Sequence, residues 1–328
     1  MEYDDILVTG GGGYVGAQLV PRLLEQGCRV TVLDLMLYGK DVLSPHPNLD
    51  LVVGEIRDQS VLQKLLKGKN AVIHLACISN DPSFELNPDL GKSINLDAFE
   101  PLVRISRDNG VGRFIYASSS SVYGIKETPE VDESMSLQPL TDYSRFKAEC
   151  ERVLSGFETS EFTTVTIRPA TVCGYSRRQR LDVVVNILTN LAYHKREITV
   201  FGGEQLRPNI HIDDMVECYL VALNAPANLI TGKIYNVGYE NQSVREIAEI
   251  VRNAIGDDVK LKSTPTTDNR SYHISSKRIH DELGFVATHS IQQAVLDLRQ
   301  AFDQGKLPNS LEDEKYFNIR RMQTLNLK

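Results

Sequence analysis

The sequence has no surplus of basic residues, because 36 lysines and arginines are outnumbered by 43 aspartates and glutamates and the net charge is −7. Such a chain is poorly suited to neutralise a nucleic-acid backbone, so no DNA or RNA partner is expected. No apolar run approaches the roughly 20 residues that span a bilayer, so no membrane partner is expected either. The first residues show no basic segment followed by an apolar one, as a secretory signal would. We therefore predict a cytoplasmic protein.

Cysteine is scarce, and its five copies are scattered along the chain. They are Cys28, Cys77, Cys150, Cys173 and Cys218. None are paired at the spacing of metal ligands, so no metal site is predicted, and an odd, scattered set suits a reducing compartment. We interpret these residues as small, buried, apolar side chains.

Short apolar runs rich in Val and Ile alternate with longer stretches of helical spacing in the first half of the chain. The predicted strands are Ile6–Thr9, Arg29–Leu33, Leu51–Val53, Ala71–Leu75, Phe114–Ala117 and Thr164–Ile167. The predicted helices are Tyr14–Gln26, Ser60–Leu66, Asn95–Asn109 and Tyr143–Phe157. This alternation is typical of a parallel sheet covered on both faces, with right-handed crossovers. The sequence predicts an α/β fold with a Rossmann-like, doubly wound parallel sheet.

The pattern changes after about Ile167. Pro169, Gly174 and a basic stretch interrupt it, and further helices are predicted. These are Leu181–His194, Asp213–Asn224, Val244–Ile255 and Ile291–Phe302. We predict a dinucleotide-binding domain over residues 1–168 and a smaller α/β substrate-binding domain over 169–328, with some segments returning to the first. The polar tail, residues 309–328, is expected to be loosely held.

A glycine loop, TGGGGYVG at residues 9–16, follows the first predicted strand and opens a helix. Gly10 allows a sharp turn, Gly13 a close approach to a pyrophosphate, and Gly16 close packing of helix on sheet. The helix N-terminus then offers N–H groups to the phosphates. Asp34 ends the second predicted strand, where an acid binds the adenosine ribose hydroxyls and repels a 2′-phosphate. The combination predicts a dinucleotide site that favours NAD over NADP.

Tyr143 and Lys147 lie four residues apart, which places both on one face of a predicted helix. A nearby ammonium group favours the phenolate, so Tyr143 is a candidate base for a sugar hydroxyl. Taken alone, such a pair is more typical of a solvated surface. A serine run at residues 118–121 follows a strand end, where ligands bind in parallel sheets, and a polar turn is its alternative interpretation.

These features together resemble the extended short-chain dehydrogenase/reductase family, in its nucleotide-sugar epimerase and dehydratase branch. The resemblance covers nearly the whole chain. Besides the glycine loop and the Tyr/Lys pair, its carriers are HLAC at 74–77, the serine run followed by VYG at 122–124, RPNIHIDD at 207–214 and YNVG at 235–238.

The resemblance implies a role for each matching residue. The implied catalytic residues are Tyr143, Lys147 and Ser119. The implied NAD-binding residues are Gly10, Gly13, Tyr14, Val15, Gly16, Asp34, Glu55, Ile56, Leu75, Ala76, Asn95, Tyr143, Lys147 and Pro169, with Glu55 standing where the family has an Asp. The implied residues for a nucleotide-diphosphate sugar are Ser79, Ser120, Ser121, Thr171, Asn186, Arg207 and Arg270, the last three at positions that hold the diphosphate.

Several positions depart from the family pattern. Dehydratases of this branch carry an Asp-Glu pair after the catalytic residue, where this chain has Ser120 and Ser121, so elimination of water is disfavoured. Thr171 stands where many epimerases have an Asn. The neighbouring cluster of Arg177, Arg178 and Arg180 is open to two interpretations: it reads a substrate carboxylate or phosphate, or it is a solvated loop.

The leading hypothesis is an NAD-dependent nucleotide-sugar 4-epimerase that oxidises C4 transiently and returns the hydride to the other face. A net oxidoreductase, acting as a 4-keto reductase or C4 dehydrogenase, is the alternative. A 4,6-dehydratase and a non-catalytic dinucleotide sensor are less favoured. The resemblance also implies a homodimer through the helices 95–109 and 143–157. The nucleotide base and the sugar stay open.

Overall fold

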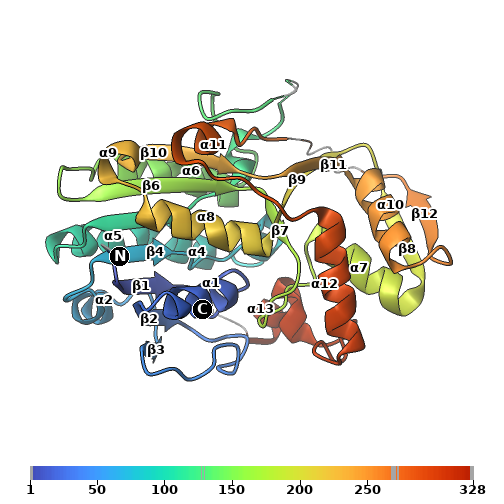
Figure 1. Cartoon of the computed structure of the whole chain (residues 1–328), viewed down its shortest axis with the longest axis horizontal. Helices are drawn as coiled ribbons and strands as arrows, with labels where there is room; N and C mark the ends of the chain where they lie inside the picture. Colours follow the sequence, from blue (N-terminus) through green and yellow to red (C-terminus); the bar gives the residue numbers. More distant parts are fainter. Residues whose placement is uncertain (1–2, 127, 129, 267–270, 272, 326–328) are drawn as a thin grey trace.

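A seven-stranded parallel sheet forms the centre of the molecule, in the order β10-β6-β5-β4-β1-β2-β3 (Figure 1). The computed structural model describes residues 3–126, 128, 130–266, 271 and 273–325. The strands are β1 (Asp5–Thr9), β2 (Arg29–Asp34), β3 (Leu49–Val53), β4 (Ala71–His74), β5 (Arg113–Ala117), β6 (Thr163–Pro169) and β10 (Lys233–Val237). The predicted α/β class with its doubly wound parallel sheet is confirmed.

Helices cover both faces of this sheet, as the continuous apolar strands require. In β1, Ile6 and Val8 point to one face and Leu7 to the other. The first face is covered by α1 (Gly16–Glu25) and α8 (Ile212–Asn224). The second is covered by α2 (Gln59–Leu65), α5 (Phe99–Asp108) and α6 (Asp142–Ser155). No helix in the described ranges has the length and apolar character needed to cross a membrane.

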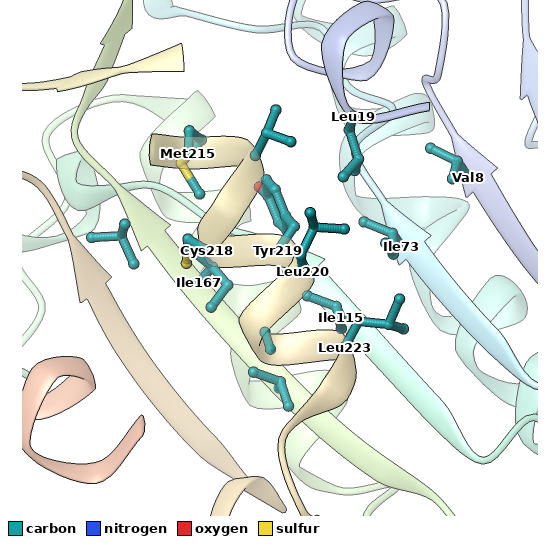
Figure 2. Close-up of a cluster of buried hydrophobic side chains, with 14 of the residues drawn as sticks. Val8, Leu19, Ile73, Ile115, Ile167, Met215, Cys218, Tyr219, Leu220 and Leu223 are labelled. Atoms are coloured by element: carbon teal, nitrogen blue, oxygen red, sulfur yellow. The ribbon is translucent and has the colours of Figure 1, made fainter. Parts of the chain in front are cut away.

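Helix α8 comes from the second half of the chain but packs on the sheet of the first half. Figure 2 shows its apolar side chains directed toward α1 and the central strands. The labelled residues are Val8, Leu19, Ile73, Ile115, Ile167, Met215, Cys218, Tyr219, Leu220 and Leu223, and all are almost completely buried. The return of α8, together with that of β10, completes the hydrophobic core of the NAD-binding half.

Several other segments of the second half form a smaller body at one end of the sheet (Figure 1). Its strands are β7 (Thr171–Cys173), β9 (Leu206–His211) and β11 (Glu240–Ser243) in one sheet, and β8 (Glu197–Phe201) and β12 (Lys260–Thr264) in another. Helices α7 (Val184–Lys195), α10 (Val244–Ile255) and α12 (Ile291–Asp303) share one apolar cluster beside them. A division of the chain at residues 168/169 stays a prediction.

Short elements connect these layers. They are α3 (Asp81–Glu85), α4 (Pro88–Lys92), the π-helical turn η1 (Ser93–Asp97), the 3-10 turns η2 (Ser120–Tyr123) and η3 (Glu314–Tyr316), α9 (Ala227–Ile230), α11 (Lys277–Leu283) and α13 (Asn318–Leu325). The helix predicted from Asn95 therefore begins later, at Phe99, because a π-helical turn precedes it.

The expectation of a loosely held tail was wrong for the described residues up to 325. Tyr316 and Phe317 pack with Leu181 and Leu298 in a buried cluster. Met322 of α13 joins the core beneath the second face of the sheet. The tail is polar overall, but its few apolar residues fall on the side that meets the protein, and this side holds it in place.

Replacing Leu223 by Ala tests the dependence of the fold on α8. Leu223 is fully buried, so the cavity left by the truncation should lower the free energy of unfolding by about 2–5 kcal/mol. The measurement is urea unfolding followed by circular dichroism. Leu229→Ala is the control, because Leu229 is 45% exposed. Equal stabilities of the two variants would show that α8 contributes little to the core.

Candidate active site

The glycine loop is pressed against the end of β4. Gly10 has a φ of 75°, in the left-handed region, and its N–H donates to the carbonyl of Leu33 at 2.9 Å. A Cβ on Gly10 would lie 2.5 Å from the backbone nitrogen of Ala76, and one on Gly16 would lie 2.6 Å from the Gly10 carbonyl oxygen. Side chains at these two positions would collide with backbone, so glycine is required. Helix α1 follows directly and is bonded back to the loop, because the N–H of Ala17 donates to the carbonyl of Gly13 at 2.9 Å.

A cavity of about 400 Å³ runs along the carboxyl ends of the central strands. It extends from the glycine loop and the end of β2, across the end of β5, to the segment after β6. A second cavity of about 300 Å³ shares the walls formed by Asp81, Thr171 and Arg180. The two spaces therefore adjoin at the end of the sheet where parallel α/β folds bind their ligands.

Most residues predicted for the site meet in this place. The larger cavity is lined by Gly10, Gly13, Tyr14, Val15, Gly16, Asp34, Glu55, Ile56, Leu75, Ala76, Ser79, Ser119, Ser120, Ser121, Tyr143, Lys147, Pro169 and Thr171. Arg207 lines the smaller cavity together with Ser121 and Thr171. Arg270 lies outside the described residues. Residues from most of the chain length thus converge on one pair of cavities.

Asp34 links the end of β2 to the glycine loop. Its Oδ2 accepts a hydrogen bond from the N–H of Gly12 at 3.0 Å, and its Oδ1 accepts one from Met36 at 2.7 Å. Burial raises the pKa of this carboxyl, while the two N–H donors and the charge of Arg178 oppose the rise. The carboxyl is thereby held in one orientation at the cavity wall, where it has lone pairs left to accept from hydroxyl groups.

Tyr143, Lys147 and Ser119 meet beside the end of β5. Tyr143 lies in the first turn of α6, which the capping side chain of Thr141 starts. The buried ammonium of Lys147 donates to the carbonyl of Ala117 at 2.6 Å and lies 5.9 Å from the centroid of the Tyr143 ring. Ser119 hydrogen-bonds the phenol of Tyr143. A hydroxyl, a phenol and an ammonium group thus face one point of the cavity.

The electrostatics around Tyr143 differ from the expectation. Burial is the largest influence and raises the pKa of the phenol, and Cys77 and Asp81 act in the same direction. The opposing influences are the charge of Arg180 and the hydrogen bond from Ser119. Lys147 was expected to lower this pKa, but its ammonium is bonded to the end of β5. Among the largest influences on this pKa, Arg180 is the cation that favours the phenolate.

A buried network fixes α6 against the sheet. Glu151 of α6 accepts from Arg168 of β6, with Nε at 3.0 Å and Nη2 at 2.6 Å, and also from the hydroxyl of Ser118. Nη1 of Arg168 donates to the phenol of Tyr123 at 2.6 Å, and that phenol donates to Asn236 of β10 at 2.8 Å. The network holds the serine run and the helix of Tyr143 in fixed register.

Two predicted residues support the cavity walls without lining them. The amide of Asn95 exchanges hydrogen bonds with the backbone of Ile78, at 2.8 Å and 2.9 Å. Asn186 accepts from the N–H of Gly174 at 3.0 Å and donates to the phenol of Tyr14 at 3.0 Å. Both amides are thus hydrogen-bonded within the protein, and direct ligand contacts of Asn95 and Asn186 stay a prediction.

The structure also brings residues to the cavity that the sequence reasoning did not assign to it. These are Tyr38, Asp81, Arg178, Arg180, Asn318 and Met322, among others. The sequence did contain a signal for Arg178 and Arg180, because the basic cluster at these positions departs from the family pattern. No comparable signal marked Asn318 and Met322, which reach the cavity only because α13 folds back across the chain.

The chain matches the model of the NAD dependent epimerase/dehydratase family over residues 6–238. It belongs to that family. It is 31% identical over 262 residues to an uncharacterised protein of Sinorhizobium fredii, covering 79% of this chain and 62% of that protein's length. It is 29% identical over 271 residues to UDP-glucose 4-epimerase of Streptomyces lividans, covering 77% and 82%. A dTDP-glucose 4,6-dehydratase of Streptomyces niveus is 27% identical over 305 residues, covering 85% and 87%.

Solved structures support the fold of this epimerase/dehydratase family member. DesIV, a dTDP-glucose 4,6-dehydratase from Streptomyces venezuelae with NAD and TYD bound, superposes with a TM-score of 0.84 at 24% sequence identity, covering 94% of this chain and all of that one. The resemblance predicted from sequence is confirmed. The relatives include both epimerases and dehydratases, so membership of the family leaves the reaction open.

NAD is the cofactor of this family, and the residues of the cavity fit it. The cradle at Gly10 and Gly16 brings backbone to positions where no side chain has room. Asp34 presents acceptors beside the glycine loop, as a ribose diol requires. Tyr143 and Lys147 lie at the other end of the same cavity. The cavity therefore has the glycine loop and Asp34 at one end and Tyr143 with Lys147 at the other.

Proposed function

We propose that the protein is a nucleotide-sugar 4-epimerase. The observation that carries the proposal is the cluster of Tyr143, Ser119 and Lys147 in the NAD cavity, which adjoins a second cavity with basic residues. The second cavity is lined by Arg180 and Arg207, which suit the diphosphate of a nucleotide sugar. The chain's similarity to UDP-glucose 4-epimerases supports the same substrate class.

The protein's own groups would manage one proton at the sugar hydroxyl. Bound NAD supplies the hydride acceptor and donor. Tyr143 removes the proton from the C4 hydroxyl and later returns it, while Ser119 hydrogen-bonds the reacting oxygen. Lys147, held by the carbonyl of Ala117, adds positive charge below the ring of Tyr143. Because Tyr143 returns the proton that it removed, the reaction needs no net exchange of protons with solvent.

Elimination of water would need an acid and a base beyond Tyr143. Ser120 and Ser121 line the cavity with hydroxyls, whose protons are not transferred readily at neutral pH. Asp81 is a carboxylate near Tyr143, but its Oδ1 already accepts from the hydroxyl of Thr141 at 2.6 Å. These contacts favour epimerisation over 4,6-dehydration.

A net oxidoreductase is the second proposal, since the same residues perform the first half of either reaction. A non-catalytic sensor would have no use for a phenol, a hydroxyl and an ammonium group gathered at one point. The choice between epimerase and oxidoreductase depends on whether reduced nicotinamide is consumed or released.

Conversion of a nucleotide sugar without net redox change tests the proposal. The purified enzyme should interconvert 4-epimers without added nicotinamide, as followed by NMR of the sugar and by absorbance of reduced nicotinamide. Tyr143→Phe should lower kcat about a hundredfold to ten-thousandfold with NAD still bound, because general acid–base catalysis is lost. Tyr239→Phe is the control, because Tyr239 is 48% exposed. Stoichiometric consumption of added NADH would instead establish the oxidoreductase.

The pH profile tests the role of Arg180. Its charge favours the phenolate of Tyr143, so Arg180→Gln should raise the pKa of that phenol. Activity requires the phenolate as base, so the rate rises with pH, and the acidic limb of log kcat should move to higher pH in the variant. Arg177→Gln is the matched control, because Arg177 is exposed and bonds Ser44. An unmoved limb would show that Arg180 does not act on Tyr143.

We also propose a homodimer through α5 and α6. The two helices lie against each other on one face of the sheet, so they offer a continuous two-helix surface to a second copy. A partner surface of the same kind would complete a four-helix bundle. Sedimentation equilibrium should then give twice the 36.7 kDa mass of the chain. A mass equal to one chain at micromolar concentration would exclude this assembly.

A further inference from the structure

Arg178 is a buried cation at the wall of the NAD cavity. Its side chain is 3% exposed, and its guanidinium carbon lies 3.5 Å from the centroid of the Tyr38 ring. Nη2 donates to Oδ1 of Asn318, whereas Nε is buried and has no hydrogen-bond partner in the part of the chain that the structure describes. No carboxylate among the described residues forms an ion pair with Arg178.

Three other arginines with little exposure are compensated differently. Arg168 has the carboxylate of Glu151, and Arg180 has that of Asp182. Nη1 of Arg113 donates to three carbonyls at the C-terminal end of α8, the negative end of the helix dipole. Burial lowers the pKa of the Arg178 guanidinium. The charges of Asp34 and Asp182 act on Arg178 from a distance, but neither carboxylate is bonded to it. A buried charge without a bonded counter-ion is costly to a folded protein, so the position suits an anion from outside the chain.

The surroundings of Arg178 indicate which anion fits. Its loop is fastened over the glycine loop, since Ser176 donates to the carbonyl of Tyr14 at 2.8 Å and Tyr14 donates to the carbonyl of Gly174 at 2.6 Å. On its other side, Tyr38 belongs to the segment that follows β2. Arg178 thus lies between the start of α1 and the end of β2, on the wall shared with the phosphate-binding backbone.

We propose that Arg178 binds the pyrophosphate of the dinucleotide, opposite the N–H groups at the start of α1. The proposal rests on the NAD cavity of the proposed function, not on its epimerase chemistry. Tyr38 and Asn318 hold the planar guanidinium on its face and at one edge, which leaves other donors for the phosphate oxygens. The other phosphate that a dinucleotide can carry is the 2′-phosphate of NADP, which the carboxylate of Asp34 would repel.

Asn318 ties this residue to the closure of the cavity. Its Oδ1 accepts from Tyr38 at 3.0 Å and from Arg178, and its Nδ2 donates to Ser79 at 2.9 Å. Its N–H donates to Asp182 at 2.8 Å. One amide from the C-terminal helix therefore spans from the β2 side of the cavity to the β4 side, and it positions the guanidinium on the way.

Binding of cofactor fragments tests the assignment. Wild type, Arg178→Met and Arg178→Lys are stripped of NAD, and their dissociation constants for NAD, ADP-ribose and adenosine are measured by calorimetry. Arg178→Met should weaken NAD and ADP-ribose about tenfold to a hundredfold, because a charge-assisted contact is lost. Adenosine has no phosphate, so its affinity should not change. The Lys variant, which keeps the charge without the fork, should fall between.

Arg177→Met is the matched control in the same loop and should bind all three ligands as the wild type does. Thermal unfolding separates ligand binding from a structural role: without ligand, Arg178→Met should be at least as stable as the wild type, because a buried unpaired charge is removed. A loss of stability without ligand, or an equal loss of adenosine affinity, would overturn the proposal. If Arg178→Met does not fold and only Arg178→Lys does, a wild-type affinity of the Lys variant for ADP-ribose would likewise overturn the proposal.

NADP distinguishes the two phosphate sources. The pyrophosphate assignment predicts that Arg178→Met weakens NAD and NADP by the same factor. A loss confined to NADP would place Arg178 at the 2′-phosphate and overturn the assignment. Neither result depends on epimerase activity, so failure here and failure of the proposed reaction are read separately.

Discussion

The buried ion pair between Glu151 and Arg168 is the constraint on which the Tyr143 end of the cavity depends. Glu151 lies about two turns beyond Tyr143 on α6, and it also accepts from Ser118, the neighbour of Ser119. Loss of one partner of a buried pair costs about 3–5 kcal/mol, so α6 cannot shift relative to β6. The phenol and the serine hydroxyl therefore meet because a charge pair behind them sets the register of their elements.

The same network shows why the NAD-binding half cannot be completed by the first half of the sequence. Tyr123 passes the network on to Asn236 of β10, which enters the sheet beside β6. Nη1 of Arg113 likewise donates to the end of α8. Polar and apolar contacts thus agree: two segments from the second half of the chain, α8 and β10, return to close the first core.

Sequence motifs predicted those parts of the site whose geometry depends on residues close together in the chain. The turn at Gly10, the acid at Asp34 and the four-residue spacing of Tyr143 and Lys147 depend on residues close in sequence, and all reach the cavity. Contacts between distant segments escaped prediction. Asn186 was predicted to bind a ligand, but its side-chain amide is hydrogen-bonded to Gly174 and Tyr14. Asn318 reaches the cavity, where it donates to Ser79, because α13 folds back across the chain. Their roles depend on which loops meet, and no periodicity encodes that.

Three arginines within four positions show that a cluster of charges in the sequence does not predict the role of each residue. Arg177 is exposed and bonds a serine, Arg180 is paired with Asp182 beside Tyr143, and Arg178 is buried without a carboxylate. A solvated loop, one of the two interpretations of the cluster, describes the first alone. The two inward arginines serve different ends of one cavity. The charge of Arg180 favours the phenolate of Tyr143, whereas Arg178 lies beside the glycine loop and forms no ion pair with a carboxylate of the described residues.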